Sequence, residues 1–305
     1  MNHPLVSIIT PTYNSATTLG KTIESVLNQG YSHIEYIIMD GQSTDHTAQV
    51  VAQFAHDSRL QFISERDSGQ TQAINKGWQR AQGDILAYLN ADDFYELDTV
   101  QTVVSTLANH PAIGWVHGYD RYVDLGGNPI PFNHARGEWN YEQYLRQELY
   151  ISQPTVFWRR EVIERFGYLR EDLFAMMDLE YFLRIGRQYP GLLIPKTLAT
   201  ITWSRQTKTF GSQRRRLVEL EAVCRAYGAT SFSPTVEMLW VEANLLEALR
   251  ALGQGDWESL QSRLADSTRY PRHLPKSLAR MVMSGILPPS LESKLRRLLL
   301  RRNTP

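Results

Sequence analysis

Short apolar stretches alternate with amphipathic stretches at the start of the chain, and this alternation limits the possible folds more than any other feature. The apolar stretches have the length of buried strands and lie at 5–10, 34–39, 60–64 and 85–89. The stretches between them carry apolar residues at helical spacing and lie at 18–29, 43–54 and 70–81. Strands that alternate with helices form a mostly parallel sheet covered by helices. The sequence therefore predicts an α/β fold.

A polar cluster follows each of these four predicted strands. The clusters lie at 10–14, 40–45, 65–70 and 90–93. Ligands of open parallel sheets bind outside the carboxyl ends of the strands. Because parallel strands place those ends on one edge, the four clusters are expected to converge there and form a site.

The fourth cluster contains two adjacent acids, Asp92 and Asp93, directly after the apolar stretch 85–89. Two like charges at a strand end are costly unless solvent, a partner or a cation neutralises them. Hard divalent cations take oxygen ligands and bridge substrate phosphates, which indicates a metal–diphosphate site. The alternative is a polar turn that begins the next helix, because acidic residues also favour helix N-termini.

The second part of the chain has a different pattern from the first. Strand and helix patterns continue to about residue 205, whereas residues 212–305 show helical patterns without a strand signal. A polar stretch and Gly211 separate the two parts. We therefore expect an α/β domain at 1–210 and a C-terminal helical region at 211–305.

Charge and cysteine content exclude several classes of protein. Lys and Arg total 32 and Asp and Glu total 32, so no basic excess indicates nucleic acid as a partner. The single cysteine, Cys224, excludes an intramolecular disulfide and a cysteine-based zinc site. No signal-peptide pattern and no apolar run of spanning length is present. These features predict a cytoplasmic location.

The C-terminal segment is locally basic. Apolar stripes between 278 and 300 are interleaved with basic residues, and Lys294, Arg296, Arg297, Arg301 and Arg302 have no acid among them. A basic amphipathic helix can lie on an anionic membrane, which would place the protein at the inner face of the cell membrane. A helix packed on the catalytic domain or on a second subunit is the open alternative.

Four segments of the chain carry a pattern of motifs in a defined order and spacing: Val6–Asn14, Ile38–Asp45, Gly83–Asp93 and Met177–Arg184. Together they resemble the family 2 glycosyltransferases of the GT-A fold, over about residues 5 to 205. One further stretch, with Asp67 and Asn75, and another, with Trp158 and Arg159, resemble a bacterial polysaccharide and glycolipid subgroup. The resemblance implies a Rossmann-like, mostly parallel sheet with flanking helices and a C-terminal helical extension.

The resemblance also implies which residues bind the donor nucleotide. Pro11 and Tyr13 would line the nucleotide pocket, and Asp40 would accept a hydrogen bond from the base, usually uracil. Asp67 and Asn75 would shape the wall near the ribose and the donor sugar. The alternatives are a helix cap for Asp40, ordinary packing for Tyr13 and a structural helix position for Asn75.

The resemblance also implies a role for each acid of the pair. Asp92 would ligate Mn²⁺ or Mg²⁺, which bridges the donor diphosphate. Asp93 would hold a metal-bound water, contact the sugar or cap a helix. Asn90, with Ala91 beside it, would face the ribose or the sugar.

Asp178 is the candidate catalytic base, because displacement at an anomeric carbon needs a carboxylate to take the proton of the acceptor hydroxyl. Its alternative is an N-cap of the helix that follows. Arg184 would either pair with an acid or be solvated. Trp158 and Arg159 are candidates for the acceptor side, with a surface ion pair as the alternative for the arginine.

The sequence departs from the family pattern at three positions. Gly41 follows Asp40 where a second acid is common, which puts strict uridine preference in doubt. Asn90 replaces the first acid of the Asp-x-Asp motif, which would lower metal affinity. Met177 replaces the usual Glu before the base.

The function implied is an inverting, metal-dependent glycosyltransferase with a UDP-sugar as the expected donor and a glycan or lipid-linked acceptor. Two alternatives stay open. A catalytically degenerate protein that binds sugar nucleotides or acts as a scaffold would fit the missing acids. A nucleotidyltransferase would need a glycine-rich, basic loop after the first strand, where this chain has Pro11–Ser15.

Overall fold

The computed structural model describes residues 3–131, 136–203 and 213–283, and of residues 279–283 the backbone only. The chain divides into two compact units, Met1–Thr207 and Lys208–Pro305. This division falls within a few residues of the boundary predicted at 210. Each unit is described by itself.

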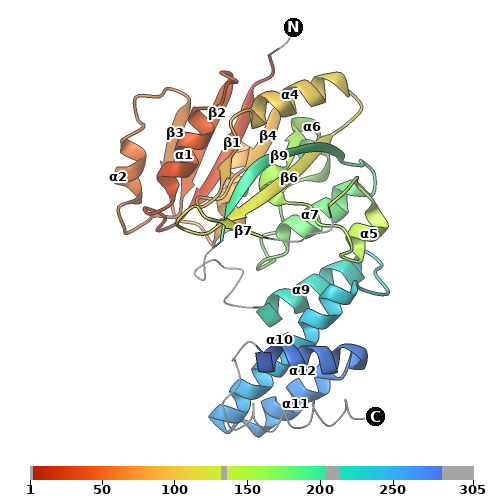
Figure 1. Ribbon diagram of the computed structural model, residues 1–305. Coiled ribbons are helices and arrows are strands. Elements are labelled where there is room, and N and C mark those ends of the chain that lie inside the picture. The colour runs from red at the N-terminus through yellow and green to blue at the C-terminus, as the bar shows by residue number, and fades with distance from the viewer. Residues whose placement is uncertain (1–2, 132–135, 204–212, 284–305) are drawn as a thin grey trace. The chain divides into compact units, whose positions relative to one another are not determined.

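The first unit is built on one mixed sheet (Figure 1). The strand order is β3-β2-β1-β4-β8-β6-β9-β5, with β7 paired to β6. The first four strands in this order are parallel, β8 is antiparallel to both of its neighbours, and β6 and β9 are parallel. The strands are β1 Val6–Thr12, β2 Ile34–Asp40, β3 Leu60–Ser64, β4 Ile85–Tyr88, β5 Phe94–Tyr95, β6 Trp115–Val123, β7 Pro129–Ile130, β8 Phe157–Arg159 and β9 Leu192–Thr202.

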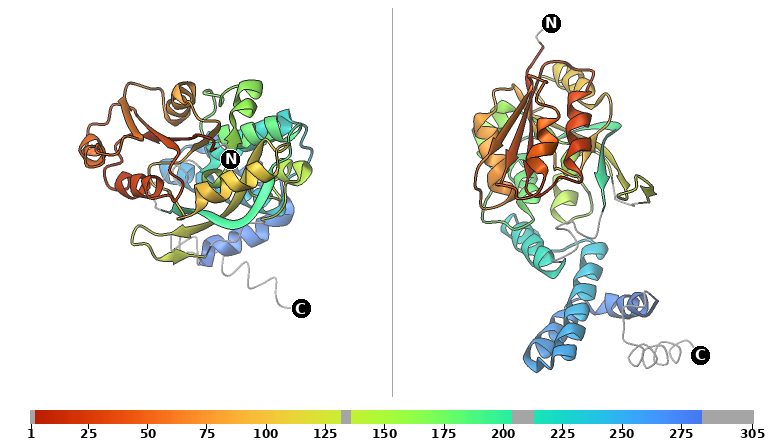
Figure 2. Two further views of the ribbon diagram at one scale, coloured as in Figure 1. Left: turned by 90° about the horizontal axis from the view of Figure 1, so that it is seen from above. Right: turned by 90° about the vertical axis from the view of Figure 1, so that its left-hand side faces the viewer.

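Helices cover both faces of this sheet (Figure 2). On one face, an apolar core joins α1, α2 and α4 to the strands through residues such as Ile23, Val51 and Val103. On the other face, α3, α7 and the sheet share a cluster of buried rings that includes Trp78, Trp158 and Tyr181. The helices are α1 Leu19–Leu27, α2 Thr47–Ala52, α3 Gln70–Arg80, α4 Thr99–Asn109, α5 Tyr141–Leu145, the 3₁₀ helix η1 Gln153–Thr155, α6 Arg160–Phe166 and α7 Met177–Gly186.

Strand register brings the polar clusters to one edge. Thr12 at the end of β1 pairs with Asp40 at the end of β2, and Asp40 pairs with Ser64 at the end of β3. Ile9 pairs with Tyr88, so the segment after β4 leaves the sheet beside the end of β1. The predicted α/β fold with a mostly parallel first half is confirmed.

The local structure differs from the sequence patterns in three places. Two short strand-like patterns, at 192–194 and 198–203, fall in one continuous strand, β9, whose pairing with β6 shifts register around Tyr119. Strand β5 and helix α5 were not predicted, since two and five residues are too short to show a period. The segment after the acid pair does not begin a helix, because β5 follows it and α4 begins only at Thr99.

The second unit is helical over its described residues. Its helices are α9 Gln213–Ala226, α10 Pro234–Gln254, α11 Trp257–Ser267, the 3₁₀ helix η2 Pro271–His273 and α12 Leu274–Met283. Two small apolar clusters lie along α10, one around Val241 and Leu245, the other around Leu217, Trp240 and Ala243. The basic segment 294–302, for which an amphipathic helix was considered, lies outside the described residues. Within residues 3–131, 136–203 and 213–283, no helix combines the length and apolar character needed to cross a membrane.

Candidate active site

The loop after β1 presents an exposed aromatic ring. Tyr13 is 62% exposed, which contradicts ordinary packing for its side chain, whereas Pro11 is buried in β1. Asn14 has a positive φ of 51°, and its side-chain oxygen accepts hydrogen bonds from the Thr44 and Asp45 amides at 2.8 and 3.3 Å. The loops after β1 and β2 are therefore held together, with the Tyr13 ring left open to solvent.

Asp40 is buried at the end of β2 with its carboxylate held by hydroxyl groups. Ser43 donates from its amide at 3.1 Å and from its hydroxyl at 2.5 Å. Ser64 donates from its hydroxyl at 2.6 Å. The carboxylate does not cap α2, because that helix begins at Thr47 and Asp45 accepts from the Thr47 amide. Asp40 is a fixed acceptor beside the Tyr13 loop.

Asp67 lies against Gly41. A Cβ atom at position 41 would be only 2.8 Å from the Asp67 Oδ2 atom, so glycine leaves the space that this carboxylate fills. Burial raises the pKa of Asp67, and the nearby charge of Asp40 raises it further. The missing second acid at position 41 is thus replaced in space by the carboxylate of Asp67.

The acid pair after β4 is split between two environments. Asp93 is 4% exposed and accepts hydrogen bonds from the Asn90 amide at 3.2 Å and the Thr202 backbone N–H at 3.3 Å. Asn90 in turn accepts from Gln70 at 2.7 Å. Asp92 is partly exposed, next to the buried Ala91. Asp93 therefore joins the β4 segment to the end of β9, whereas Asp92 is only partly buried.

The position of Asp92 and Asp93 disfavours the charged form of both carboxyl groups. Burial raises the pKa of Asp92. Burial and the charge of Asp92 raise the pKa of Asp93 well above its usual range. A bound cation would relieve this cost. Among the described residues, no three His, Cys, Asp or Glu side chains converge as a metal cage. Asp92 offers carboxylate oxygens, the kind of ligand that Mg²⁺ takes, but it does so without a second acid beside it that is free of other hydrogen bonds.

Asp178 lies in the first turn of α7, near the end of β4. Its charge adds to burial in raising the pKa of Tyr88 well above the usual range. It is not the N-cap, since α7 begins at Met177 and Met176 occupies that position. Two residues further, the buried Glu180 pairs with Arg184 at 2.7 Å, so Arg184 has an acid partner.

Asn75 is not available to a donor sugar. Its amide nitrogen donates to the Leu169 carbonyl at 2.9 Å and to Glu171 at 3.0 Å. Its amide oxygen accepts from the Leu169 N–H at 3.0 Å. The prediction of a donor contact is therefore replaced by the structural alternative, in which α3 holds the segment before α7.

Trp158 and Arg159 are also corrected, because neither lies on the acceptor side. Trp158 is 1% exposed and packs in the aromatic cluster with Trp78 and Phe182. Arg159 pairs with Ile85 in the sheet, at the amino end of β4. Its guanidinium donates to backbone carbonyls around the end of α4, which is the edge opposite to the acid pair.

Sequence reasoning missed the hydroxyl and amide groups that hold the acids. Ser43, Ser64, Gln70 and the Thr202 amide fix Asp40, Asn90 and Asp93, as described above. Ser43 lay inside a recognised motif, and Gln70 lay in the cluster at 65–70. Ser64 and Thr202 gave no signal, because only the sheet brings them to the rim.

Residues 7–167 match the family described as Glycosyl transferase family 2. This match covers more than half of the 305 residues. The chain therefore belongs to family 2, and it is a glycosyltransferase by family.

Relatives in three bacteria support this membership. The chain is 33% identical to an uncharacterized glycosyltransferase of Haemophilus influenzae over 57% of this chain and 71% of that protein. It is 34% identical to the putative teichuronic acid biosynthesis glycosyltransferase TuaG of Bacillus subtilis, over 52% and 63%. It is 31% identical to the chondroitin synthase of Escherichia coli, over 61% and 27%. The match thus spans less than two thirds of the second and third relatives.

Two solved structures share the fold. TarS of S. aureus, in complex with UDP-GlcNAc, matches 91% of this chain and 80% of that chain with a TM-score of 0.62 at 17% identity. The mannosyltransferase PcManGT from Pyrobaculum calidifontis, in complex with GDP-Man and Mn²⁺, matches 98% and 81% with a TM-score of 0.59 at 22% identity. The fold is therefore GT-A, as the resemblance implied.

Proposed function

We propose that this protein is an inverting, metal-dependent hexosyltransferase that uses a nucleoside-diphosphate sugar, with UDP as the expected nucleotide. Its product would be a cell-surface polysaccharide or glycolipid. The observation that carries the proposal is the order of groups along the carboxyl edge of the sheet. Asp40 lies at β2, Asp92 and Asp93 follow β4, and Asp178 lies near Tyr88 at the end of β4.

The nucleoside would bind at β1, β2 and β3. The exposed ring of Tyr13 offers a stacking surface for the base, and Asp40 offers a carboxylate acceptor for a base N–H. Asp67 beside Gly41 supplies a second acceptor at the same place. Ala91 and Asn90 then lie between the nucleoside and the sugar.

The diphosphate would bind next to Asp92. Asp92 would hold Mn²⁺ or Mg²⁺ through its carboxylate, and such a cation neutralises the charge of the leaving diphosphate. Asp93, held by Asn90 and by the Thr202 amide, would fix the position of Asp92 and not bind the metal itself.

Asp178 would act as the base in a single displacement. Its carboxylate takes the proton of the acceptor hydroxyl as that oxygen bonds to the anomeric carbon of the donor. The bond from the anomeric carbon to the diphosphate oxygen breaks, and the electron pair leaves with the nucleoside diphosphate. Attack opposite to the leaving group inverts the anomeric configuration.

The relatives support the donor and the product class. The structures named above are complexes with UDP-GlcNAc in one case and with GDP-Man and Mn²⁺ in the other. The name of TuaG refers to teichuronic acid and that of another relative to chondroitin, both of which are polysaccharides. A lipid-linked acceptor would agree with a location at the inner face of the cell membrane.

The test is to incubate the purified protein with UDP-sugars, GDP-mannose and Mn²⁺, using a crude lipid extract as acceptor. Nucleoside diphosphate release and product mass are measured. Asp178→Asn is expected to lower transfer by at least about a hundredfold with donor binding retained. Asp92→Ala is expected to lower both. Asp172→Asn, an exposed acid six residues before Asp178 that pairs with Arg170, is the matched control.

Two results would contradict the proposal. Substantial turnover by Asp178→Asn would remove the base assignment. Donor binding without any nucleoside diphosphate release, with or without acceptor, would instead favour a degenerate sugar-nucleotide-binding protein.

A further inference from the structure

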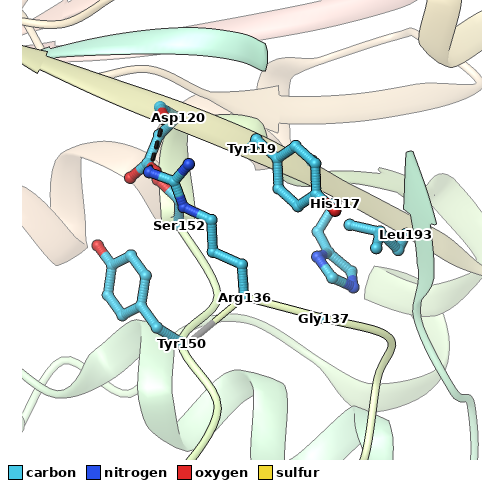
Figure 3. Close-up of a pocket in the computed structure, with 9 residues that line it drawn as sticks. His117, Tyr119, Asp120, Arg136, Gly137, Tyr150, Ser152 and Leu193 are labelled. Carbon is cyan, nitrogen blue, oxygen red and sulfur yellow. Dashed lines mark hydrogen bonds and ion pairs between the residues drawn. The ribbon is translucent and has the colours of Figure 1, made fainter. Parts of the chain in front are cut away.

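Strand β3 leaves one edge of the sheet open. It is the outermost strand at one end of the strand order, with β2 as its neighbour (Figure 1). Its residues are half-buried or exposed, and Phe62 is 36% exposed. Strand β6, by contrast, is covered by the segment 136–152, whose Arg136 pairs with Asp120 (Figure 3). The β3 edge is therefore a place where a further strand could join the sheet.

The hydrogen bonds to β2 show which backbone groups of β3 face outward. The Arg59 carbonyl accepts from the Tyr36 N–H at 2.9 Å, and the Glu65 N–H donates to the Asp40 carbonyl at 2.9 Å. The N–H and C=O of one residue point to the same side of a strand, and successive residues alternate. The odd-numbered residues of β3 therefore bond to β2. The backbone groups that face the open edge belong to Leu60, Phe62 and Ser64.

Most of these outward groups lack a partner. The Leu60 N–H donates to the Asp57 carbonyl at 3.1 Å. The other outward N–H and C=O groups of Leu60, Phe62 and Ser64 meet no hydrogen-bond partner among the residues that the structure describes. Exposed strand edges are commonly protected by Lys, Pro or a bulge, because open groups pair with other chains. Leu60–Ser64 contains no charged residue and no Pro, so no such device opposes pairing here.

Two-fold symmetry fixes how a second copy would pair with this edge. Identical edges related by a two-fold axis are antiparallel, and the outward residues are centred on Phe62. Phe62 would then exchange hydrogen bonds with Phe62 of the partner subunit, and the Ser64 N–H would donate to the carbonyl of Leu60 of the partner subunit. The one outward N–H that already has a partner, that of Leu60, is not needed for these bonds.

The same register brings complementary side chains together. Phe62 lies opposite Phe62 of the partner subunit, and aromatic pairs at opposed positions stabilise antiparallel strands. Arg59 lies opposite Glu65 of the partner subunit on each side of the axis, so opposite charges meet at both ends of the pairing. Within its own subunit Arg59 pairs with Asp57, and Glu65 pairs with Lys76. No like charges are therefore opposed between positions 59 and 65.

We propose that β3 is the interface of a homodimer, in which a second copy of this chain continues the sheet through antiparallel β3–β3 pairing. This inference goes beyond the proposed function and does not depend on it. The pairing uses backbone groups and the Phe62 ring, so the Ser64 hydroxyl keeps its hydrogen bond to Asp40 at 2.6 Å. The strand has only five residues, and such a short interface predicts a weak, concentration-dependent dimer.

Sedimentation equilibrium of the full chain over a range of concentrations tests the dimer. The mass of the wild type is expected to rise from monomer to dimer and no further, because a two-fold pairing closes. Phe62→Lys places two ammonium groups opposite each other on the axis and should weaken the dimer Kd at least tenfold. Gln79→Lys, which adds the same charge at an exposed position of α3, is the matched control and should leave the Kd unchanged.

Cysteine cross-linking tests the register and does not depend on the folding of Phe62→Lys. Phe62→Cys should form a disulfide-linked dimer under mild oxidation, because the Cα atoms of a hydrogen-bonded pair lie about 5.5 Å apart, which a disulfide can span. Gln61→Cys is the control, since position 61 lies opposite 63 and its two copies are diagonal neighbours about 7–8 Å apart. It should cross-link at least tenfold less. The native Cys224 is buried, so background cross-linking should be low.

The outcomes leave no ambiguity about the interface. A wild type that stays monomeric throughout, or a dimer that Phe62→Lys leaves intact, overturns the proposal. Equal cross-linking at positions 61 and 62, or none at 62, overturns it as well. Species larger than a dimer that Phe62→Lys removes would also contradict it, because they need a pairing that does not close. None of these measurements involves a nucleotide or a sugar, so their failure leaves the proposed function unaffected.

Discussion

The two carboxylates after β4 lie in different environments, although they belong to adjacent residues. Asp93 is turned inward and satisfied by Asn90 and the Thr202 amide, whereas Asp92 keeps access to solvent. The amide of Asn90 therefore does something a second acid could not do, because it donates to Asp93 while accepting from Gln70. The departure from the Asp-x-Asp pattern is built into a hydrogen-bond chain and does not leave a vacant position.

Gly41 and Asp67 form a second coupled pair at the residue scale. Gly41→Ala is expected to push the Asp67 carboxylate away, because the new Cβ would lie 2.8 Å from Oδ2. Donor affinity, measured by calorimetry, should fall about as much as in Asp67→Ala, and the double variant should be no worse than Asp67→Ala alone. Additive losses in the double variant would contradict this coupling.

His117 makes stability depend on pH. Burial lowers the pKa of His117 to about 4, below the value of about 6.5 in an unfolded chain. The unfolded state then binds more protons between these values, so this contribution is present above pH 6.5 and is lost as the pH falls toward 4. The loss should reach on the order of 3 kcal/mol.

Urea unfolding of the wild type and His117→Gln at several pH values measures this effect. The variant, which cannot be protonated there, should show a flatter dependence between pH 6.5 and 4. Parallel curves for the two proteins would show that His117 is not buried as a neutral side chain.

At the scale of the elements, helix α3 acts as a clamp: through Asn75 it holds the segment before α7 and does not line the proposed donor pocket. Its residue Asn75 uses both the oxygen and the nitrogen of its amide to hold the backbone of Leu169 and the side chain of Glu171. That segment leads directly into α7, whose first turn carries Asp178. The clamp therefore helps to position the candidate base from the far end of the segment.

Asn75→Ala is expected to lower the free energy of unfolding by about 2 kcal/mol, because the Leu169 N–H and carbonyl lose their partner. Urea unfolding measures this, and donor affinity should be unchanged in the folded protein. Gln79→Ala, at an exposed position of the same helix, should change stability by less than about 0.5 kcal/mol. A tenfold loss of donor affinity with unchanged stability would restore Asn75 to the donor site.

Periodicity predicted the elements that repeat often enough to show it. Helix α3 and strands β1 to β4 were predicted within a few residues, and so was the edge where their ends meet. β5 and α5 are too short to carry a period. Trp158 and Arg159 show a different failure. Their motif marks the antiparallel strand β8, and only its pairing with β4 reveals that they lie in the core and at the far edge.

The positions of Tyr13, Asp40 and Asp92 at the carboxyl edge of the sheet were predictable, because each residue ends its own strand or follows it closely. The ion pair between Asp120 and Arg136 was not predictable, because a hairpin and a further segment separate these two residues in the sequence. The two residues meet only because the fold brings the segment after β7 back to β6.

For the whole molecule, the balance of charge makes any attraction to a membrane local. The 32 basic and 32 acidic residues give a net charge of zero at pH 7, so the protein as a whole is not drawn to anionic lipid. The segment 294–302 carries five basic residues and no acid. Basic residues near an anionic surface contribute about 1 kcal/mol each.

Flotation with vesicles that contain an anionic lipid tests whether this segment binds membrane. The full chain should float with these vesicles, should not float with neutral vesicles, and should be released by high salt because exposed charges are screened. Replacing Lys294, Arg296, Arg297, Arg301 and Arg302 by Gln should abolish flotation while leaving donor binding intact. Equal flotation of the two proteins, or none for either, would favour the alternative in which this segment packs on protein.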